Sequence, residues 1–216
     1  MLKVKLITAV LVLGLASAEA NALIINIDAT VSGCTTCSGG PTDPSVAAGT
    51  VVTLIHPVII TLGPGTYTIA NAATVNGVES GANLGFVAWN YQAGNPNPWV
   101  WSFLVATDNG NGTGTMIKGE YVAGVFPTQA AVAGATGVVT GNYSTVLSST
   151  STAGFIDTLV LAQTTTLDFF TDDYFLPDNA GGVALKIVPE PSTLLLLVAG
   201  LVSLGVGRGR GRQSPS

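Results

Sequence analysis

A succession of short β-branched runs separated by turn residues occupies residues 23–187, and it limits the fold more than any other feature of this sequence. Runs of this length and alternation are typical of strands, and clusters of Gly, Pro, Asn and Asp mark the turns between them. The run DNGNGTG at residues 108–114 predicts a tight hairpin. Roughly nine strands are expected, at residues 23–31, 51–62, 66–70, 84–91, 99–107, 115–126, 154–162, 165–170 and 182–188.

The pattern predicts an all-β fold, namely an antiparallel β-sandwich of the jelly-roll type. Pro57 has no amide hydrogen for a sheet ladder, so it should interrupt or bend the run at residues 51–62, or mark a sheet edge. The body of the chain, residues 23–187, has one expected helix, at residues 127–135, where Pro127 and several alanines favour helix formation.

Residues 1–22 differ in composition from the rest of the chain. They open with Lys3 and Lys5, continue with an apolar stretch of about a dozen residues, and end with small residues around Ala20 and Ala22. This order is typical of a secretory signal peptide, and the apolar stretch is too short for a spanning helix. Cleavage after Ala20 and cleavage after Ala22 both fit the pattern.

Charge is scarce and mostly negative in the body, residues 23–187. Charged residues make up 9% of the chain. Between residues 23 and 187 two lysines, Lys118 and Lys186, stand against ten carboxylates, a formal net charge of −8. Because phosphate binding requires a basic surface, a nucleic-acid partner is not expected, whereas divalent cations and neutral sugars fit.

The two cysteines, Cys34 and Cys37, form the motif Cys-Thr-Thr-Cys. Behind an export signal, a local disulfide between them is favoured, with free thiols as the alternative. The residues after Cys37 are Ser, Gly, Gly and Pro, which indicate a loop rather than the helix of a redox motif. A zinc site would need more ligands than one histidine and two cysteines supply.

His56 is the only histidine, and it lies in an apolar run with no recognisable nucleophile motif around it. A structural or edge position is therefore expected, and the protein is predicted not to be an enzyme. The paired carboxylates of a glycosidase are defined by their distance in space, which a sequence does not specify. A secreted glycan-active enzyme therefore stays as a third hypothesis.

An acidic loop lies at residues 168–182, where the sequence reads DFFTDDYFLPDNAGG. Ca²⁺ prefers carboxylate, amide and carbonyl oxygens as ligands. The same residue types are common in turns, where they hydrogen-bond their own backbone. A calcium site and an ordinary turn both remain open from the residues alone. The candidate side chains are Asp172, Asp173, Asp178 and Asn179.

The segment at residues 167–188 resembles the closing hairpin of galactose-binding-like β-sandwiches, and in particular of small calcium-dependent galactose-specific bacterial lectins. In such lectins the loop holds calcium, which in turn binds sugar hydroxyls. The resemblance implies calcium as a cofactor and carbohydrate as a ligand. It also implies Asp172, Asp178 and Asn179 as the metal ligands.

Trp99 and Trp101 suggest a second sugar-binding feature, since exposed aromatic rings stack on the faces of sugars. The two residues lie beside the turn-rich segment AGNPNP. Residues two apart on a strand share one side of it. Burial of both rings in the core and a stacking platform for carbohydrate are both consistent with this spacing.

The end of the chain, at residues 188–212, combines a Pro-Glu-Pro motif, an apolar helix at residues 192–207 that is expected to lie in the membrane, and three arginines. This arrangement resembles the PEP-CTERM sorting signal of Gram-negative bacteria. The resemblance implies that an exosortase recognises Pro189, Glu190 and Pro191. It also implies anchoring in the inner membrane before processing, and then release or attachment at the cell surface, in exopolysaccharide-rich biofilms.

These observations predict an exported cell-surface or extracellular-matrix protein that binds carbohydrate, such as exopolysaccharide, through a calcium-assisted loop. The alternative is a purely structural matrix protein without a ligand. The expected path runs from export through a transient inner-membrane anchor to the cell surface or the medium. The predicted segments are 1–22 (signal peptide), 23–187 (β-sandwich), 188–212 (sorting signal) and 213–216 (tail).

Overall fold

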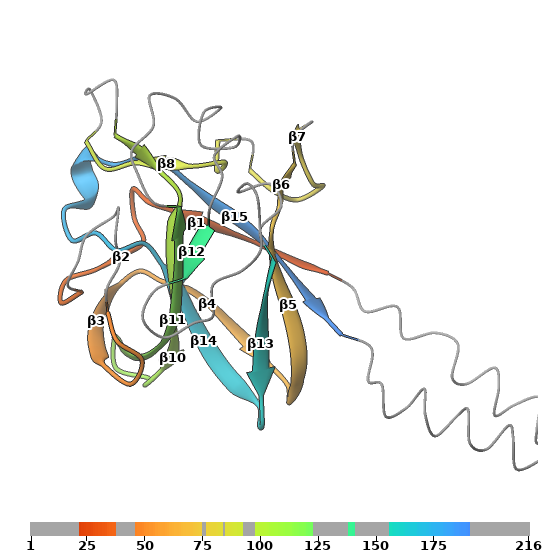
Figure 1. Ribbon diagram of the computed structural model, residues 1–216. Helices are drawn as coiled ribbons and strands as arrows, with labels where there is room; N and C mark the ends of the chain where they lie inside the picture. Colours follow the sequence, from red (N-terminus) through yellow and green to blue (C-terminus); the bar gives the residue numbers. More distant parts are fainter. Residues whose placement is uncertain are drawn as a thin grey trace, which may run out of the picture. The chain divides into compact units, whose positions relative to one another are not determined.

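A computed structural model describes most of the body of the 216-residue chain, and the described residues form an all-β fold of curled antiparallel sheets (Figure 1). All of them except Pro189 and Glu190 belong to a compact unit that spans Ala22–Val188. The described residues are 22–37, 46–74, 77–83, 85–92, 98–122, 138–140 and 156–190.

The strands vary in length from two-residue pairs to long ladders. A 3-10 turn, η2 (Leu176–Asp178), precedes the last of them. The strands are β1 (Leu23–Asp28), β2 (Gly33–Cys34), β3 (Val51–Ile55), β4 (Val58–Leu62), β5 (Gly65–Asn71), β6 (Ala73–Thr74), β7 (Gly77–Val78), β8 (Trp89–Asn90), β9 (Trp99–Val100), β10 (Ser102–Asp108), β11 (Thr113–Val122), β12 (Val138–Thr140), β13 (Ile156–Leu161), β14 (Thr165–Phe170) and β15 (Ala180–Pro189).

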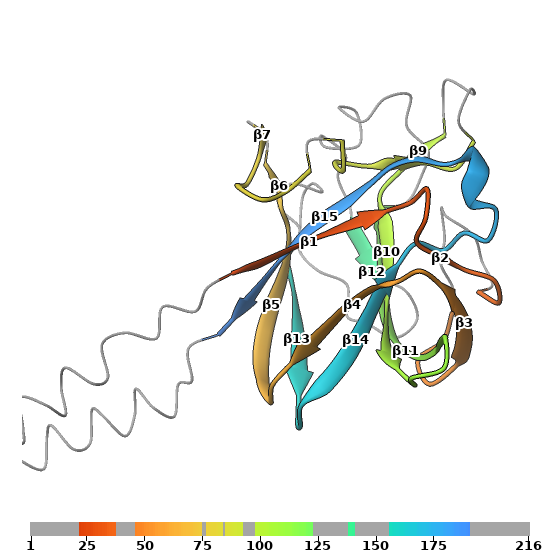
Figure 2. The ribbon, with the colours of Figure 1, turned by 180° about the vertical axis from the view of Figure 1, so that it is seen from behind.

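The first sheet has six strands, in the order β13-β5-β15-β8-β9 with β1 also paired to β15. β1 and β15 are antiparallel, with Leu23 opposite Ile187 and Asp28 opposite Gly182. The first and the last strand of the body therefore lie side by side (Figure 2). The chain enters and leaves this unit at the same end of one strand pair.

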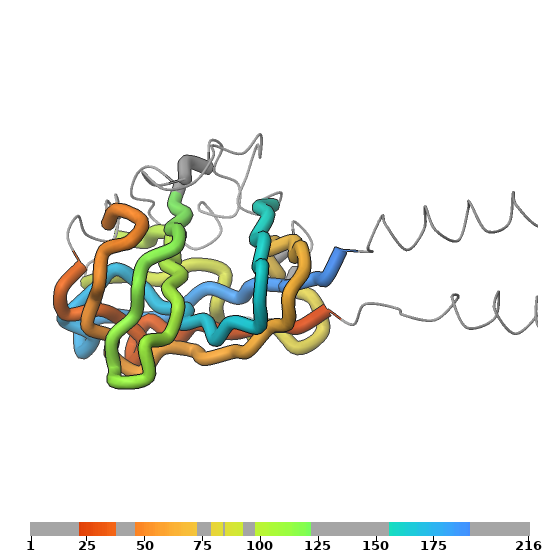
Figure 3. Tube along the Cα trace, turned by 90° about the horizontal axis from the view of Figure 1, so that it is seen from below, coloured from red at the N-terminus to blue at the C-terminus, as the bar shows by residue number. Residues whose placement is uncertain are grey.

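The second sheet has seven strands, in the order β2-β3-β11-β10-β14-β4 with β12 also paired to β11. A separate two-stranded sheet joins β6 to β7. Figure 3 shows β10 and β11 as one hairpin with β3 beside it. The hairpin thus forms the middle of the second sheet.

One hydrophobic core draws side chains from both larger sheets. β5 and β15 of the first sheet contribute Ile69 and Leu185, while β10 and β14 of the second contribute Phe103 and Phe169. Full burial of such a side chain contributes about 1.5–3 kcal/mol relative to exposure. This shared core holds the two sheets together.

β10 is buried on both faces, unlike a strand with one face in solvent. Phe103 and Val105 lie in the core shared by the sheets, whereas Leu104 and Ala106 belong to a second cluster on the opposite face. Cys34 of β2 belongs to that second cluster as well. Because residues of β2 and β10 meet there, the second sheet curls over its own outer face.

The hairpin predicted from DNGNGTG is confirmed. β10 ends at Asp108 and β11 begins at Thr113, and the Asn109 N–H donates to the Thr113 carbonyl at 3.0 Å. Gly110 and Gly112 have φ angles of 79° and 74°. Only glycine adopts this left-handed conformation without a Cβ penalty, which explains why the turn contains both.

Pro57 interrupts the apolar run at residues 51–62, as predicted. β3 ends at Ile55 and β4 begins at Val58. His56 is exposed at the break, with a φ angle of 41°. β4 is an edge strand of the second sheet, where a residue without an amide hydrogen is tolerated.

Other expectations differ from the structure or lie outside the described residues. The strand expected at residues 84–91 shrinks to the two-residue β8, and the short pair of β6 and β7 was not expected at all, since two residues have no period. The expected signal segment through residue 21, the helix at 127–135 and the membrane helix at 192–207 are not among the described residues. Within the described part of the chain, no helix combines the length and apolarity needed to cross a membrane.

Candidate functional site

The acidic loop that was predicted to bind calcium connects β14 to β15 at residues 171–179. The 3-10 turn η2 occupies its second half and ends at Asp178. Asp172 and Asn179 are buried, and Asp178 is half-buried. All three expected calcium ligands therefore belong to one short loop directly before the last strand.

Hydrogen bonds fix this loop against the segment that follows β1. The Cys34 N–H donates to the Asp173 carbonyl at 2.9 Å. The Asn179 side-chain amide donates to the Ala29 carbonyl at 2.8 Å. These two contacts, one in each half of the loop, join residues that are 139 and 150 positions apart in the chain, and they hold the loop in one place.

Gly33 allows the close approach of the two segments. A Cβ atom at this position would collide with the carbonyl oxygen of Asp173 and with Cδ2 of Leu176. Beside it, the Ser32 carbonyl accepts the Thr171 hydroxyl at 2.5 Å. The absence of a side chain at Gly33 is thus a condition for the position of the acidic loop.

Two oxygens of consecutive residues in the loop are buried without a hydrogen-bond partner in the part of the chain that the structure describes. They are Oδ1 of Asp178 and Oδ1 of Asn179. A buried acceptor without a partner costs about 1–3 kcal/mol. A bound cation or an ordered water would remove that cost, and both oxygens are of the type that calcium accepts.

Asp173 serves the loop in a different way. Its Oδ1 accepts the N–H of Phe175 at 2.9 Å, which is the arrangement by which aspartate stabilises a turn. Its backbone carbonyl oxygen accepts the hydrogen bond from the Cys34 N–H. For this residue the turn interpretation of the acidic loop therefore holds.

Two aromatic residues in the middle of this loop, Tyr174 and Phe175, were not among the candidates from the sequence. Tyr174 is 74% exposed and Phe175 is 54% exposed. Large exposed apolar groups that occur together are typical of binding surfaces rather than of a stabilising core. The signal in the sequence was an aromatic pair between Asp173 and Pro177, where neither a strand nor a helix can bury it.

The structure contradicts the stacking interpretation for Trp101. Its side chain is fully buried in the core shared by the sheets, and its ring meets the Phe103 ring edge-on with the centroids 5.5 Å apart. Trp99, in β9, is half-buried and packs against the same core. A ring needs one solvent-exposed face to stack on a sugar, so Trp101 is a core residue.

A disulfide joins Cys34 to Cys37, whose Cα atoms lie 5.7 Å apart. Cys34 is buried in the second cluster, and its backbone N–H is bonded to Asp173 of the acidic loop. The bridge therefore restrains the segment on which the acidic loop rests. A disulfide this short in sequence removes little chain entropy, so we assign it a local role.

Asp168 lies on β14 rather than in the loop, paired with Ala106 of β10 and Ile59 of β4. It is 1% exposed, and among the described residues neither carboxylate oxygen has a hydrogen-bond partner. Burial, and after it the negative charge of Asp108, raises the pKa of Asp168 to about 6. The protonated form is favoured because it carries no charge into the buried site.

The Pro-Glu-Pro motif begins where the last strand ends. β15 runs through Pro189, and Glu190 is exposed. Pro191 is not among the described residues. Proline has no amide hydrogen to donate to a sheet ladder, and the end of a strand does not require one. The position of Pro189 agrees with this.

The described residues contain no group of three or more His, Cys, Asp and Glu side chains placed to hold a metal. A cation at the acidic loop would therefore need amide or backbone oxygens beside the carboxylates, a mixture that calcium accepts. The chain matches no family model, no curated protein and no solved structure.

Proposed function

We propose that this protein is an exported cell-surface or extracellular-matrix protein, processed by an exosortase, that binds carbohydrate through a calcium-assisted loop. Its all-β body is proposed to be a jelly-roll sandwich of the galactose-binding-like kind. The core that takes side chains from both larger sheets supports the sandwich. The proposed role is non-catalytic.

Features at both ends of the chain support the sorting part of the proposal. Residues 1–22 have the pattern of a signal peptide, and residues 188–212 combine the Pro-Glu-Pro motif, an apolar segment and terminal arginines. Pro189 is the last residue of β15, and Glu190, directly after it, is exposed.

Replacement of both Glu190 and Pro191 by alanine is expected to abolish processing, because it removes the side chains that define the motif. The uncleaved chain should then accumulate in the inner membrane, which cell fractionation and immunoblotting would measure. Ser192→Ala and Thr193→Ala, directly after the motif, serve as the matched control and should be processed normally. Normal processing of the Glu190 and Pro191 variant would refute the sorting assignment.

The observation that carries the ligand proposal is the pair of buried oxygens on Asp178 and Asn179, which have no hydrogen-bond partner in the described part of the chain. Ca²⁺ accepts carboxylate, amide and carbonyl oxygens together. Tyr174 and Phe175, in the same loop, are exposed. A sugar would then meet calcium through its hydroxyls and an aromatic ring through its apolar face.

A specific observation favours the second candidate, a structural matrix protein without a ligand. The loop is already fixed by hydrogen bonds from Cys34 and Asn179 and by the turn at Asp173. Such a loop keeps its shape without a metal ion. The two candidates therefore differ in whether calcium binds the two buried oxygens, and calcium titration separates them.

Asp178→Asn is expected to remove stabilisation by calcium, because it deletes a charged ligand while keeping the shape of the side chain. Calcium at a hundred times its Kd would add about 2.7 kcal/mol to the free energy of unfolding. This corresponds to a rise in Tm of several degrees, measured by thermal unfolding with Ca²⁺ and with EDTA. Asp173→Asn keeps its turn acceptor and should retain the rise. A wild-type Tm that does not respond to Ca²⁺ would overturn the calcium site.

Glycan-array binding with and without a chelator tests the carbohydrate part. Tyr174→Ala is expected to weaken binding about tenfold, which corresponds to about 1.4 kcal/mol. Val160→Ala, an exposed side chain on β13, is the control and should leave binding unchanged. If no glycan binds under either condition, carbohydrate binding is refuted and the second candidate, a structural matrix protein without a ligand, is favoured.

A further inference from the structure

Three charged side chains lie in the interior, at strand positions where the alternation of inward and outward side chains normally places apolar residues. They are Lys118 and Glu120 on β11 and Asp157 on β13, and these strands belong to different sheets. Along β13, Asp157 is buried in line with Leu159 and Leu161, while the residues between them are exposed. Asp157 therefore occupies a core position of its strand.

The register of β11 places its two charged residues on the same interior face. Lys118 lies opposite Val105 and Glu120 lies opposite Phe103, and both of these β10 residues belong to the core shared by the sheets. Residues directly opposite in an antiparallel pair share a face. Lys118 and Glu120 therefore point toward the first sheet, and Glu120 is 0% exposed.

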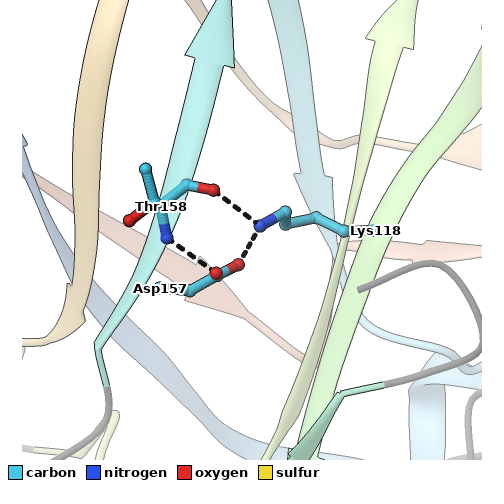
Figure 4. A network of polar contacts seen from close by, with 3 residues as sticks. All are labelled: Lys118, Asp157 and Thr158. Carbon is cyan, nitrogen blue, oxygen red and sulfur yellow. Dashed lines mark hydrogen bonds and ion pairs between the residues drawn. The ribbon is translucent and has the colours of Figure 1, made fainter. Parts of the chain in front are cut away.

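Figure 4 shows Lys118 reaching across from β11 to Asp157 and Thr158 of β13. The Lys118 Nζ contacts Oδ2 of Asp157 and donates to the Thr158 carbonyl at 3.0 Å. The Thr158 N–H donates to the other oxygen, Oδ1 of Asp157, at 2.6 Å. The side chains of Lys118 and Asp157 are each 8% exposed.

Burial changes which protonation states are favoured among these groups. Desolvation lowers the pKa of the Lys118 ammonium, and the negative charge of Glu120 opposes part of that effect. Proton transfer from the ammonium to the Asp157 carboxylate replaces two buried charges by a neutral amine and a neutral acid. A desolvated neutral amine is a nucleophile, and a carboxylic acid in contact with it is its electrophile.

We propose that Lys118 and Asp157 are joined by an intramolecular amide bond that links the two sheets covalently. The lone pair of Nζ attacks Cγ of Asp157, so that the Nζ–Cγ bond forms and the Cγ–Oδ2 bond breaks. Oδ2 leaves as water, carrying its own acid proton and one proton from the amine. Glu120 relays that second proton and ends in its starting state. The step is a condensation and needs neither an oxidant nor a reductant.

The neighbouring backbone groups fit this reaction. The Thr158 N–H stabilises the negative charge that develops on Oδ1 in the tetrahedral intermediate. The Thr158 carbonyl already accepts one Nζ proton, and the single N–H of the product amide keeps that bond. Holding the two reacting groups in contact replaces a bimolecular encounter, which raises the effective concentration by orders of magnitude. The surrounding core excludes the water that would reverse the step.

The other lysine of the body provides a matched comparison. Lys186 pairs with Glu79 at 2.7 Å, but both side chains are about a third exposed, at 31% and 32%. Water reaches this pair, so the desolvation that acts on the buried pair is absent and no condensation is expected there. The difference between Lys118 and Lys186 is therefore burial rather than the presence of a carboxylate.

Trypsin digestion distinguishes a free lysine side chain from one joined in an amide bond, because trypsin cleaves after lysine only where the ammonium is free. Lys118 and Lys186 are the only lysines between residues 23 and 187. The full chain, denatured and with its disulfide reduced, is expected to resist cleavage after Lys118 and to be cleaved after Lys186. Its mass should lie one water below that of its sequence between the determined termini, and fragmentation should place the loss between Lys118 and Asp157.

Three variants and a matched control define the chemistry. Lys118→Arg should restore tryptic cleavage at this position and the full mass, whereas Lys186→Arg should keep the loss of water. Glu120→Gln keeps the size but cannot exchange a proton, so it should slow bond formation by about a hundredfold or more in a time course of cell-free synthesis. Glu120→Asp should restore part of the rate.

The wild-type digest decides the proposal even if a variant does not fold. Complete cleavage after Lys118 with the full mass would show an ordinary ion pair and overturn the amide bond. A loss of water located at other residues would overturn it as well. Bond formation in Glu120→Gln at the wild-type rate would support the bond and remove Glu120 from its role as proton relay.

Discussion

Gly33 shows how one residue without a side chain positions the acidic loop. The backbone of Asp173 lies so close to Gly33 that a Cβ atom would occupy the space of its carbonyl oxygen. That oxygen also accepts the Cys34 N–H, so it cannot move without losing a hydrogen bond. The sequence shows a glycine here but gives no reason for it, since the reason is a contact across the fold.

Gly33→Ala is therefore expected to lower the free energy of unfolding by about 1–3 kcal/mol, as other overpacked sites do. Urea denaturation would measure the change. Gly85→Ala is the matched control, because the nearest atom to its Cβ would be Oδ1 of Asn83 at 3.4 Å, an ordinary contact. Equal stability of the two variants would contradict the close approach at Gly33.

Asp168 should make stability depend on pH in an unusual direction. Its pKa of about 6 in the folded state is higher than the usual value near 4 for aspartate. The folded state therefore holds a proton that the unfolded chain has lost between these values, and stability falls as pH rises from about 4 to about 6. Up to about 3 kcal/mol is lost over this window, with no further change above it.

Urea denaturation at pH 4, 5, 6 and 7 would measure the free energy of unfolding. In Asp168→Asn this free energy should lack the fall between pH 4 and pH 6, because the amide does not titrate. Asp108→Asn removes the neighbouring negative charge and keeps the acceptor for the turn at Gly110. In that variant the fall in stability should end at a lower pH, because the like charge that helps to raise the pKa of Asp168 is gone. An unchanged midpoint would indicate that burial alone sets this pKa.

The strands themselves follow from local pattern where one face is buried and the other is not. β13 shows this pattern, since it lies within its predicted run with every second residue buried. β14 has the predicted bounds, but its last four residues are all buried. β10 departs from this pattern, because the curl of the second sheet buries its outer face too. A period of two identifies a strand but does not reveal whether a neighbouring segment covers its second face.

The β10–β11 hairpin has a conformational requirement that a substitution can test. Gly112 has a φ angle of 74°, and a Cβ atom added there would meet no atom within 4 Å, so only backbone strain opposes a side chain. Gly112→Ala should cost about 1–2 kcal/mol of stability in thermal or urea unfolding. Gly112→Asn should cost less, since asparagine tolerates this conformation. Equal costs would contradict the assignment of this cost to the left-handed conformation.

At the scale of the whole molecule, the first and the last strand of the body depend on each other. β1 pairs with β15 along its length, and β15 adds Val183, Leu185 and Ile187 to the shared core. The body therefore cannot complete its first sheet until its last strand has been synthesised. This contact has high sequence separation, which is typical of slow-forming β topologies.

A chain that ends at residue 179 should fail to fold, because it lacks β15 and leaves β1 without its partner. A chain that ends after Glu190 keeps every described strand and should fold. Far-UV circular dichroism and limited proteolysis would compare the two. A protease-resistant body in the shorter chain would contradict the closing role of β15.

The sequence by itself determined local features of this protein: most of the longer strands, the hairpin at residues 108–114, the break at Pro57 and the Pro-Glu-Pro motif that begins at the end of the last strand. Each of these depends on neighbours in the chain, through period, turn chemistry or composition. Only the tertiary structure decided that Trp101 is buried, that Tyr174 is exposed, and that Lys118 meets Asp157 from the opposite sheet. These outcomes depend on which faces pack together, and packing joins residues whose separation in sequence carries no information about their distance.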